Sequence, residues 1–228
     1  MNDTSVAQKR KTASRGRRAK GEQTRLKILE AVLAIVAREG TRGVTHRAVA
    51  AQAGVQLSLT TYYFDDIDAM LREAFRHFSQ RTRPDAELLW SQIFSYLDGF
   101  SAAQLRRVAV REEVCEELAE RAAQYLITQI IDKPVGLAVE QILFTHTRLS
   151  PELKRLGDAH RKVLLEPLTL LCSRFNRDDP ETDAELLLNT VTTLEYQALA
   201  VPRDRIDKDR LLRLLRRHIG WILGLQRA

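Results

Sequence analysis

The chain has 228 residues, of which 44% are apolar, so it can build a real core in one domain or two small ones. No stretch approaches the roughly 18 uninterrupted apolar residues of a membrane span, and the basic, polar N-terminus is not typical of a secretory signal. Cys115 and Cys172 lie far apart without a CxxC motif. We therefore expect no disulfide, no metal site and no membrane partner, and a reducing cytoplasm fits.

The net charge of +6 is unevenly distributed. Through Thr60 the chain carries twelve Lys and Arg but four Asp and Glu, a net charge of +8, which leaves −2 for the remainder. A basic end joined to a near-neutral body indicates an electrostatic contact with a polyanion at that end. The alternative is a solvated tail that only improves solubility.

Helical periodicity begins after a polar start. Residues 1–20 are too polar and too charged to fold alone, so they predict a disordered basic arm. An apolar stripe from Gln23 to Arg38 predicts a helix that stops at Gly40. Thr45 is a good N-cap for a short helix through about Gln52. A second short helix then ends near Phe64, and Asp65 and Asp66 can cap the next one.

The rest of the chain predicts longer helices. Ser101 with Gln104 forms a capping box before a helix that reaches about Ile131. Pro134, Pro151 and Pro180 each suit a first helical turn, and the last helix starts near Asp207. No alternating apolar run stands between strand turns, so the chain is expected to be all-α.

The two short helices around Gly54 have the spacing of a DNA-reading unit. The first has a Thr cap and an inward Val49, and a small-residue turn follows it. The second is short and rich in hydroxyls, and Phe64 closes it as a core anchor. Such a helix offers small side chains to base edges at its start and tyrosine hydroxyls to phosphates at its end. By themselves, two short helices joined by a glycine turn are also an ordinary packing unit.

The segment "ILEAVLAIVAREG … VTHRAVAAQAGVQLSLTTYYF" resembles the N-terminal domain of TetR/AcrR-family transcriptional regulators over about residues 20–80. The resemblance implies a three-helix DNA-binding domain at 21–82, with the helix-turn-helix at about 45–64, and a helical-bundle dimerisation and effector domain at 83–228. It implies a repressor that binds a palindromic operator in double-stranded DNA as a homodimer. An unknown small-molecule effector would release it, without a cofactor, in a bacterial cytoplasm and on the nucleoid when bound to DNA.

The resemblance also assigns the DNA-contacting residues. Arg47 can bind guanine bidentately, and three side chains of the second short helix fall on base-facing positions. Where relatives often place a phosphate-binding Lys, this chain has acidic residues at 65, 66 and 68, so the arm is expected to supply charge in a minor groove. The expected DNA-binding residues are His46, Arg47, Leu57, Ser58, Thr61, Tyr62, Tyr63, Arg15, Arg17 and Arg18.

In the body, the resemblance implies dimerisation through the last two helices and an effector pocket among the middle ones. The interface candidates are Leu186, Leu187, Thr190, Leu194, Leu215, Ile219 and Ile222; burial against their own chain is the alternative. The pocket candidates are Trp90, Phe94, Tyr96, Tyr125, Phe144, Thr145 and His146, each of which can also be ordinary core. Cys115 lies among glutamates that disfavour its thiolate.

Two other functions compete with this one. An enzyme is not expected, because no catalytic or phosphate-binding motif occurs and the histidines are scattered singly. A DNA-bound adaptor, whose body binds another protein in place of a small molecule, stays open.

Overall fold

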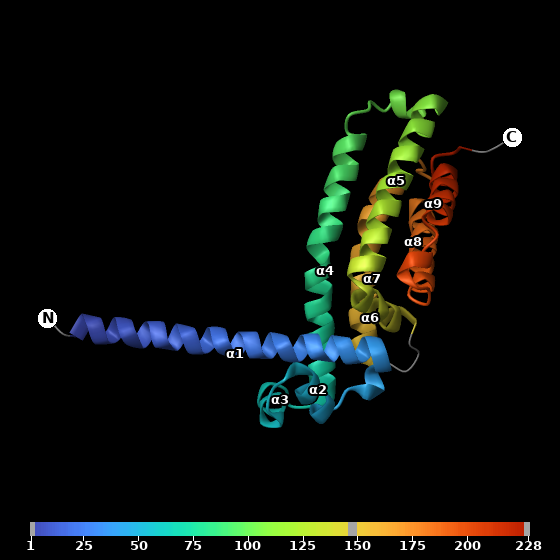
Figure 1. The fold of residues 1–228 in the computed structure, drawn as a ribbon. Coiled ribbons are helices and arrows are strands. Elements are labelled where there is room, and N and C mark those ends of the chain that lie inside the picture. Colours follow the sequence, from blue (N-terminus) through green and yellow to red (C-terminus); the bar gives the residue numbers. More distant parts are fainter. Residues whose placement is uncertain (1–2, 146–149, 226–228) are drawn as a thin grey trace. The chain divides into compact units, whose positions relative to one another are not determined.

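The computed structural model describes the backbone of residues 3–145 and 150–225, and the side chains of residues 19–145 and 150–225. Within these ranges the chain forms nine α-helices and three short 3-10 turns without a strand (Figure 1). The prediction of an all-α fold is confirmed. The chain divides into two compact units, Met1–Phe78 and Ser79–Ala228. This boundary and the boundary expected after residue 82 both fall inside helix α4 (Ile67–Leu97).

The first unit is built around helix α1 (Asp3–Glu39). Its apolar stripe is buried as predicted, with Ile28, Val32 and Val36 fully enclosed. The backbone is already helical from Asp3, where the sequence predicts a disordered arm. Lys, Arg, Ala and Gln dominate that segment and have high helix propensity, which an argument from hydrophobicity ignores. Disorder of the free arm stays a prediction.

The helix-turn-helix follows the 3-10 turn η1 (Thr41–Gly43) and consists of α2 (His46–Ala53) and α3 (Leu57–Tyr63). The side chain of Thr45 caps α2 by accepting a hydrogen bond from the backbone N–H of Ala48 at 3.1 Å. Gly54 ends α2 with a φ of 64°, in the left-handed region that favours glycine. Both features agree with the sequence prediction.

The second unit contains the rest of α4 and five further helices. Their starts match the sequence prediction at the prolines and at Asp207, whose side chain accepts a hydrogen bond from the N–H of Arg210. Ser150 and Asp179 cap two of these helices in the same way. The helices are α5 (Val108–Asp132), α6 (Pro134–Thr145), α7 (Pro151–Ser173), α8 (Pro180–Ala198) and α9 (Lys208–Ile222), with the 3-10 turn η3 (Arg203–Arg205) before α9.

The capping box at Ser101 begins a 3-10 turn and not the long helix that the sequence predicts there. Ser101 and Gln104 form the expected capping box, with reciprocal bonds at 2.8 and 3.3 Å. The box opens only the 3-10 turn η2 (Gln104–Arg106), and helix α5 begins later, at Val108. The Leu105 side chain is buried and its carbonyl accepts from Arg111 Nε at 2.8 Å, so tertiary contacts hold the turn apart from the helix.

The core of the second unit is apolar and includes both cysteines. Burial raises the pKa of the Cys115 thiol to about 11, and the charge of Glu116 adds to the shift. Burial likewise raises the pKa of Cys172 to about 12. The expectation of an unreactive Cys115 therefore holds, although burial is the larger cause. None of the described helices combines the length and apolarity of a membrane span.

Candidate DNA-binding site

Helix α3 carries an exposed face at its start and at its end. Ser58 and Thr61 are exposed on this face, and the side chain of Leu57 is 47% exposed. Tyr62 is 78% exposed, which is unusual for an aromatic residue in an ordered helix. Phe64 is buried at the end of the helix, as the sequence predicts. The helix therefore keeps one face for its own core and leaves the other for a partner.

Two side chains fix α3 against α2. Thr60 is buried and donates its hydroxyl proton to the carbonyl of Leu57 at 2.8 Å. Its Oγ1 also lies 3.0 Å from Nδ1 of His46. Because the hydroxyl proton is already used, Nδ1 of His46 donates to this oxygen. His46 is thus partly buried and tied to the neighbouring helix, which the sequence did not predict.

This bond limits what His46 can offer to DNA. In the neutral ring, a proton on Nδ1 leaves Nε2 as an acceptor. An acceptor suits the amino group of a base and does not suit a phosphate oxygen. Arg47, the next residue, is exposed. The first turn of α2 therefore presents His46 as a positioning residue and Arg47 as a cation that pairs with no described side chain.

Tyr63 lies against the first helix of the unit. A Cβ added at Gly21 of α1 would meet the Tyr63 hydroxyl at 3.2 Å, so the two residues approach closely. The Tyr63 ring also contacts the Tyr62 ring edge-on, with centroids 5.0 Å apart. Tyr63 is half-buried, and of the two tyrosines Tyr62 is the more available to a phosphate.

Ion pairs connect α1 with the first part of α4. Arg25 pairs with Glu73 and places its guanidinium 5.8 Å from the centre of the Phe64 ring. His77 Nε2 lies 2.8 Å from the Glu30 carboxylate. These contacts hold the frame on which α2 and α3 rest.

The acidic start of α4 serves in part as a cap. Asp66 Oδ1 accepts from the N–H of Ala69 at 2.6 Å, as the sequence predicts. Asp65 and Asp68 are exposed. Their charges oppose a phosphate at this helix start, so phosphate affinity must come from other residues. Arg15, Arg17 and Arg18, which were expected to supply it, have side chains outside the described ones.

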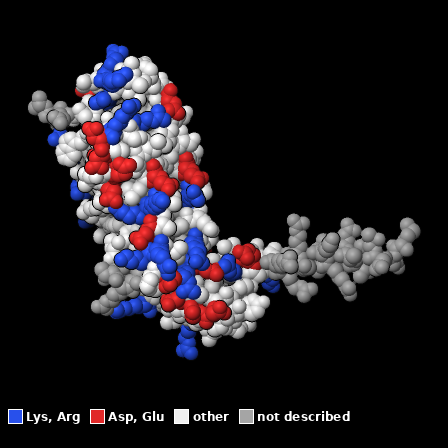
Figure 2. All heavy atoms as spheres, turned by 180° about the vertical axis from the view of Figure 1, so that it is seen from behind, with Lys and Arg blue, Asp and Glu red and all other residues white. Residues whose placement is uncertain are grey.

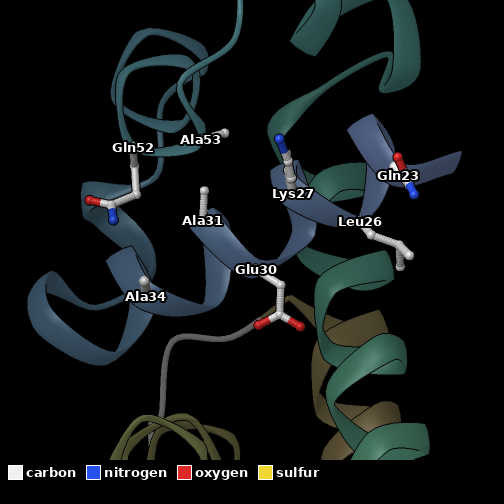
Figure 3. A pocket seen from close by; sticks show the side chains of 8 residues that line it. All are labelled: Gln23, Leu26, Lys27, Glu30, Ala31, Ala34, Gln52 and Ala53. Atoms are coloured by element: carbon white, nitrogen blue, oxygen red, sulfur yellow. The ribbon is translucent and has the colours of Figure 1, made fainter. Parts of the chain in front are cut away.

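An open hollow of about 800 Å³ lies between α1 and α2 of the same unit (Figure 3). Small apolar residues such as Ala31 and Ala34 line it together with polar side chains, among them Gln52 and Lys27. Because it lies on the DNA-binding unit, it is distinct from the effector pocket expected among the middle helices.

The expected effector residues that the structure describes lie in the second unit. Trp90 and Phe94 stack on α4 with centroids 5.8 Å apart, and Phe144 packs on His160 at 5.7 Å. Tyr125 and Tyr96 pack against the core, whereas Thr145 is exposed at the end of α6. His146 lies outside the described residues. The effector pocket stays a prediction.

A buried polar cluster was missed by sequence reasoning. Glu140 accepts a hydrogen bond from the Tyr196 hydroxyl at 3.0 Å, and its second oxygen lies 3.0 Å from Nε2 of His160. Glu195 is buried nearby, and its pKa lies well above the usual range because of burial and the charge of Glu140. These residues come from α6, α7 and α8, and no spacing along the chain links them.

The dimer candidates require a correction. Leu187, Leu194, Leu215, Ile219 and Ile222 are at most 5% exposed and form core within their own chain, so they are not interface residues. The exposed apolar side chains of the same helices are Leu186 (52%), Leu214 (38%) and Trp221 (58%). An amphipathic pattern cannot show which of two apolar stripes faces the core, and for this reason the prediction failed.

Comparison with known proteins agrees with this architecture. No family model matches the chain. The chain is 21% identical over 208 residues to the HTH-type transcriptional regulator PksA of Bacillus subtilis, covering 88% of this chain and 90% of the relative. A putative TetR-family transcriptional regulator from Mesorhizobium loti superposes with a TM-score of 0.64, at 15% identity, over 90% of this chain and 97% of that one. This chain has the TetR-family fold.

A second solved structure extends the comparison to a ligand. A putative transcriptional regulator from Saccharomonospora viridis, determined in complex with choline, has a TM-score of 0.59 at 18% identity. It is matched over 85% of this chain and 94% of that one. The prediction of a TetR-type fold is confirmed, and the similar protein from Bacillus subtilis is a helix-turn-helix transcriptional regulator.

Proposed function

We propose that this TetR-type regulator is a homodimeric repressor that binds a palindromic operator and leaves it when a small-molecule effector binds the second unit. The observation that carries the proposal is the exposed face of α3, anchored through Thr60 and presented beside the exposed cation of Arg47. A helix held in this way can enter a major groove without losing contact with its own core.

The contacts divide into base and phosphate contacts. Leu57, Ser58 and Thr61 face the bases, where Leu57 suits a thymine methyl group and the hydroxyls suit several base edges. Arg47 reads a guanine from the start of α2. Tyr62 donates to a phosphate, and the basic arm with Arg15, Arg17 and Arg18 adds charge in the minor groove.

The proposed dimer surface lies on α8 and α9. Thr190 Oγ1 and His218 Nδ1 are joined at 2.8 Å and link the two helices. Leu186 lies one turn before Thr190 on α8, and Leu214 and Trp221 lie one turn to either side of His218 on α9. Isologous packing of this two-helix surface creates a two-fold axis that matches half-sites about one helical turn apart.

The effector is proposed to bind within the second unit, among the middle helices. The choline complex of the relative from Saccharomonospora viridis supports a small-molecule ligand in this fold.

On the face of the helical bundle seen in Figure 2, Lys and Arg alternate with Asp and Glu. A surface that binds a polyanion carries charge of one sign, so this face is not expected to bind DNA. Both cysteines are free and buried, which suits the cytoplasm we propose for this protein.

Selection of genomic fragments by the purified protein tests this function. A repressor of this kind enriches a small set of fragments that share a palindromic sequence. Duplex binding then falls when the effector is added. Enrichment without any shared sequence would contradict operator recognition, and turnover of a substrate by the same preparation would favour an enzyme.

A further inference from the structure

Three polar side chains of the second unit, two buried and one partly buried, make no hydrogen bond or ion pair with any described residue. Glu195 on α8 is 5% exposed and Gln129 on α5 is 8% exposed. The hydroxyl of Tyr125, one turn before Gln129 on the same face of α5, is likewise without a partner among the described residues. Burial without a partner is costly for such groups.

The polar atoms of these three residues are not completely sealed from solvent. Among the described residues, Arg216 Nε is the only fully enclosed side-chain nitrogen or oxygen without a hydrogen-bond partner. The atoms of Glu195, Gln129 and Tyr125 make no bond yet are not fully enclosed, so each faces accessible space. Helices α5 and α8 are in contact, which brings the three residues to one region of the bundle.

The region has an excess of acidic groups. The charges of Glu195 and Glu140 both act on Tyr125 and raise its pKa, after the larger effect of burial. Burial also raises the pKa of the Tyr196 hydroxyl, which is bonded to Glu140, and the same two carboxyls add to this shift. Two carboxyls and two tyrosines therefore lie within electrostatic range of one another.

The nearby basic groups all contact residues other than Glu195, although the charge of Arg161 also acts on Tyr196. His160 is bonded to Glu140, and Lys133 pairs with Asp85. Arg161 lies over the Phe144 ring at 5.9 Å and donates to Asn189 at 3.0 Å. Within the described part of the chain, no cation neutralises Glu195.

We propose that Glu195, Tyr125 and Gln129 together bind a small organic cation, with its ammonium group against Glu195. Tyrosine rings attract such a cation through their faces, and the Tyr125 and Gln129 polar groups suit a hydroxyl or amide on the same ligand. A metal ion suits this region less well, because no group of three His, Cys, Asp or Glu among the described residues has the arrangement to hold one.

The inference rests on the proposed function, since it names the chemical class of the effector. It also predicts a proton release. In the free protein, burial and Glu140 raise the pKa of Glu195 and favour its neutral form. A bound ammonium favours the carboxylate, so the proton leaves Glu195 for the solvent on binding. At pH values below the pKa that Glu195 has in the free protein, the affinity for the cation therefore rises with pH, by up to about tenfold per pH unit.

Calorimetry with the full chain tests the proposal through paired probes. The probes are choline, tetraethylammonium and 3,3-dimethylbutan-1-ol, which has the shape of choline without its charge. At least one of the two cations should bind. The neutral alcohol should bind at least about tenfold more weakly than choline or show no binding. The Glu195→Gln variant should bind the cation at least about tenfold more weakly than the wild type. Glu185→Gln is the matched control, because Glu185 is an exposed residue of the same helix.

A second measurement needs no variant. Titration of the wild-type protein with the cation in two buffers of different ionisation enthalpy reports the released proton directly. The proposal is overturned if neither cation binds, if the neutral alcohol matches choline, if Glu195→Gln binds as tightly as wild type, or if no proton is released. Duplex binding measured without any cation tests the repressor function separately, so the two failures are distinguishable.

Discussion

The Nδ1 atom of His46 lies 3.0 Å from Oγ1 of Thr60, and the Thr60 hydroxyl donates its proton to the Leu57 carbonyl. This pair joins the first turn of α2 to the middle of the helix proposed to enter DNA. The geometry of the reading face thus depends on a residue that the sequence assigned only to DNA contact.

Thr60→Val should remove this bond while it keeps the shape of the side chain. We expect the free energy of unfolding to fall by about 1 kcal/mol, because one hydrogen bond is lost and His46 loses its acceptor. Urea denaturation measures the change. Thr61→Val is the control: Thr61 is exposed, so this variant should retain stability yet bind the operator less tightly. Equal stability of both variants would show that the bond does not hold α3.

Arg47→Ala should weaken operator binding by about 1–3 kcal/mol, because a bidentate contact to guanine is lost. Binding to unrelated DNA should fall much less. Fluorescence anisotropy with both duplexes measures the difference. Arg42→Ala removes an equal charge from an exposed site on the same unit and should not discriminate between the duplexes. Equal losses on both duplexes for Arg47→Ala would instead indicate a phosphate contact.

Deletion of residues 1–19 should flatten the dependence of affinity on salt. Each phosphate that the arm neutralises adds about 0.9 to the slope of log K against log salt, and the deletion removes six of the eight basic residues from Lys9 to Arg25. We expect a slope lower by several units in the dimer, with dimerisation unchanged. Titrations at several salt concentrations give this slope. If it does not change, the arm is a solubility tail.

Trp221→Glu should shift the protein from dimer to monomer, because it places a charge in the proposed two-helix surface. Sedimentation velocity measures the shift. Leu88→Glu is a suitable control, since Leu88 is 62% exposed on α4 and Trp221 is 58% exposed on α9. A monomer in the wild type, or a dimer that tolerates Trp221→Glu, would exclude this surface as the interface.

Local chemistry predicted most of the fold. Thr45, Ser150, Asp179 and Asp207 cap helices where the sequence places them, because a cap needs only residues within one turn. Pro84 shows the limit of such rules. It is exposed inside α4, and the helix continues through it although a proline removes one helical hydrogen bond.

The candidate sites were predicted less completely, because some of their residues lie far apart along the chain and come together only in the folded structure. The exposed face of α3 follows from short-range spacing, so Leu57, Ser58 and Thr61 could be found. The bond between His46 and Thr60 depends on how two helices cross. The buried polar cluster forms only when three helices pack together, because it consists of Glu140, His160 and Glu195 on α6, α7 and α8. Neither composition nor spacing along the chain predicts this contact.

The two buried thiols make this protein convenient for labelling. Only the thiolate attacks a maleimide, and with pKa values of about 11 and about 12 Cys115 and Cys172 ionise very little at neutral pH. Burial also shields both thiols from the reagent. A cysteine introduced on the exposed face of α3 would thus carry a single fluorophore per chain without removal of the native pair.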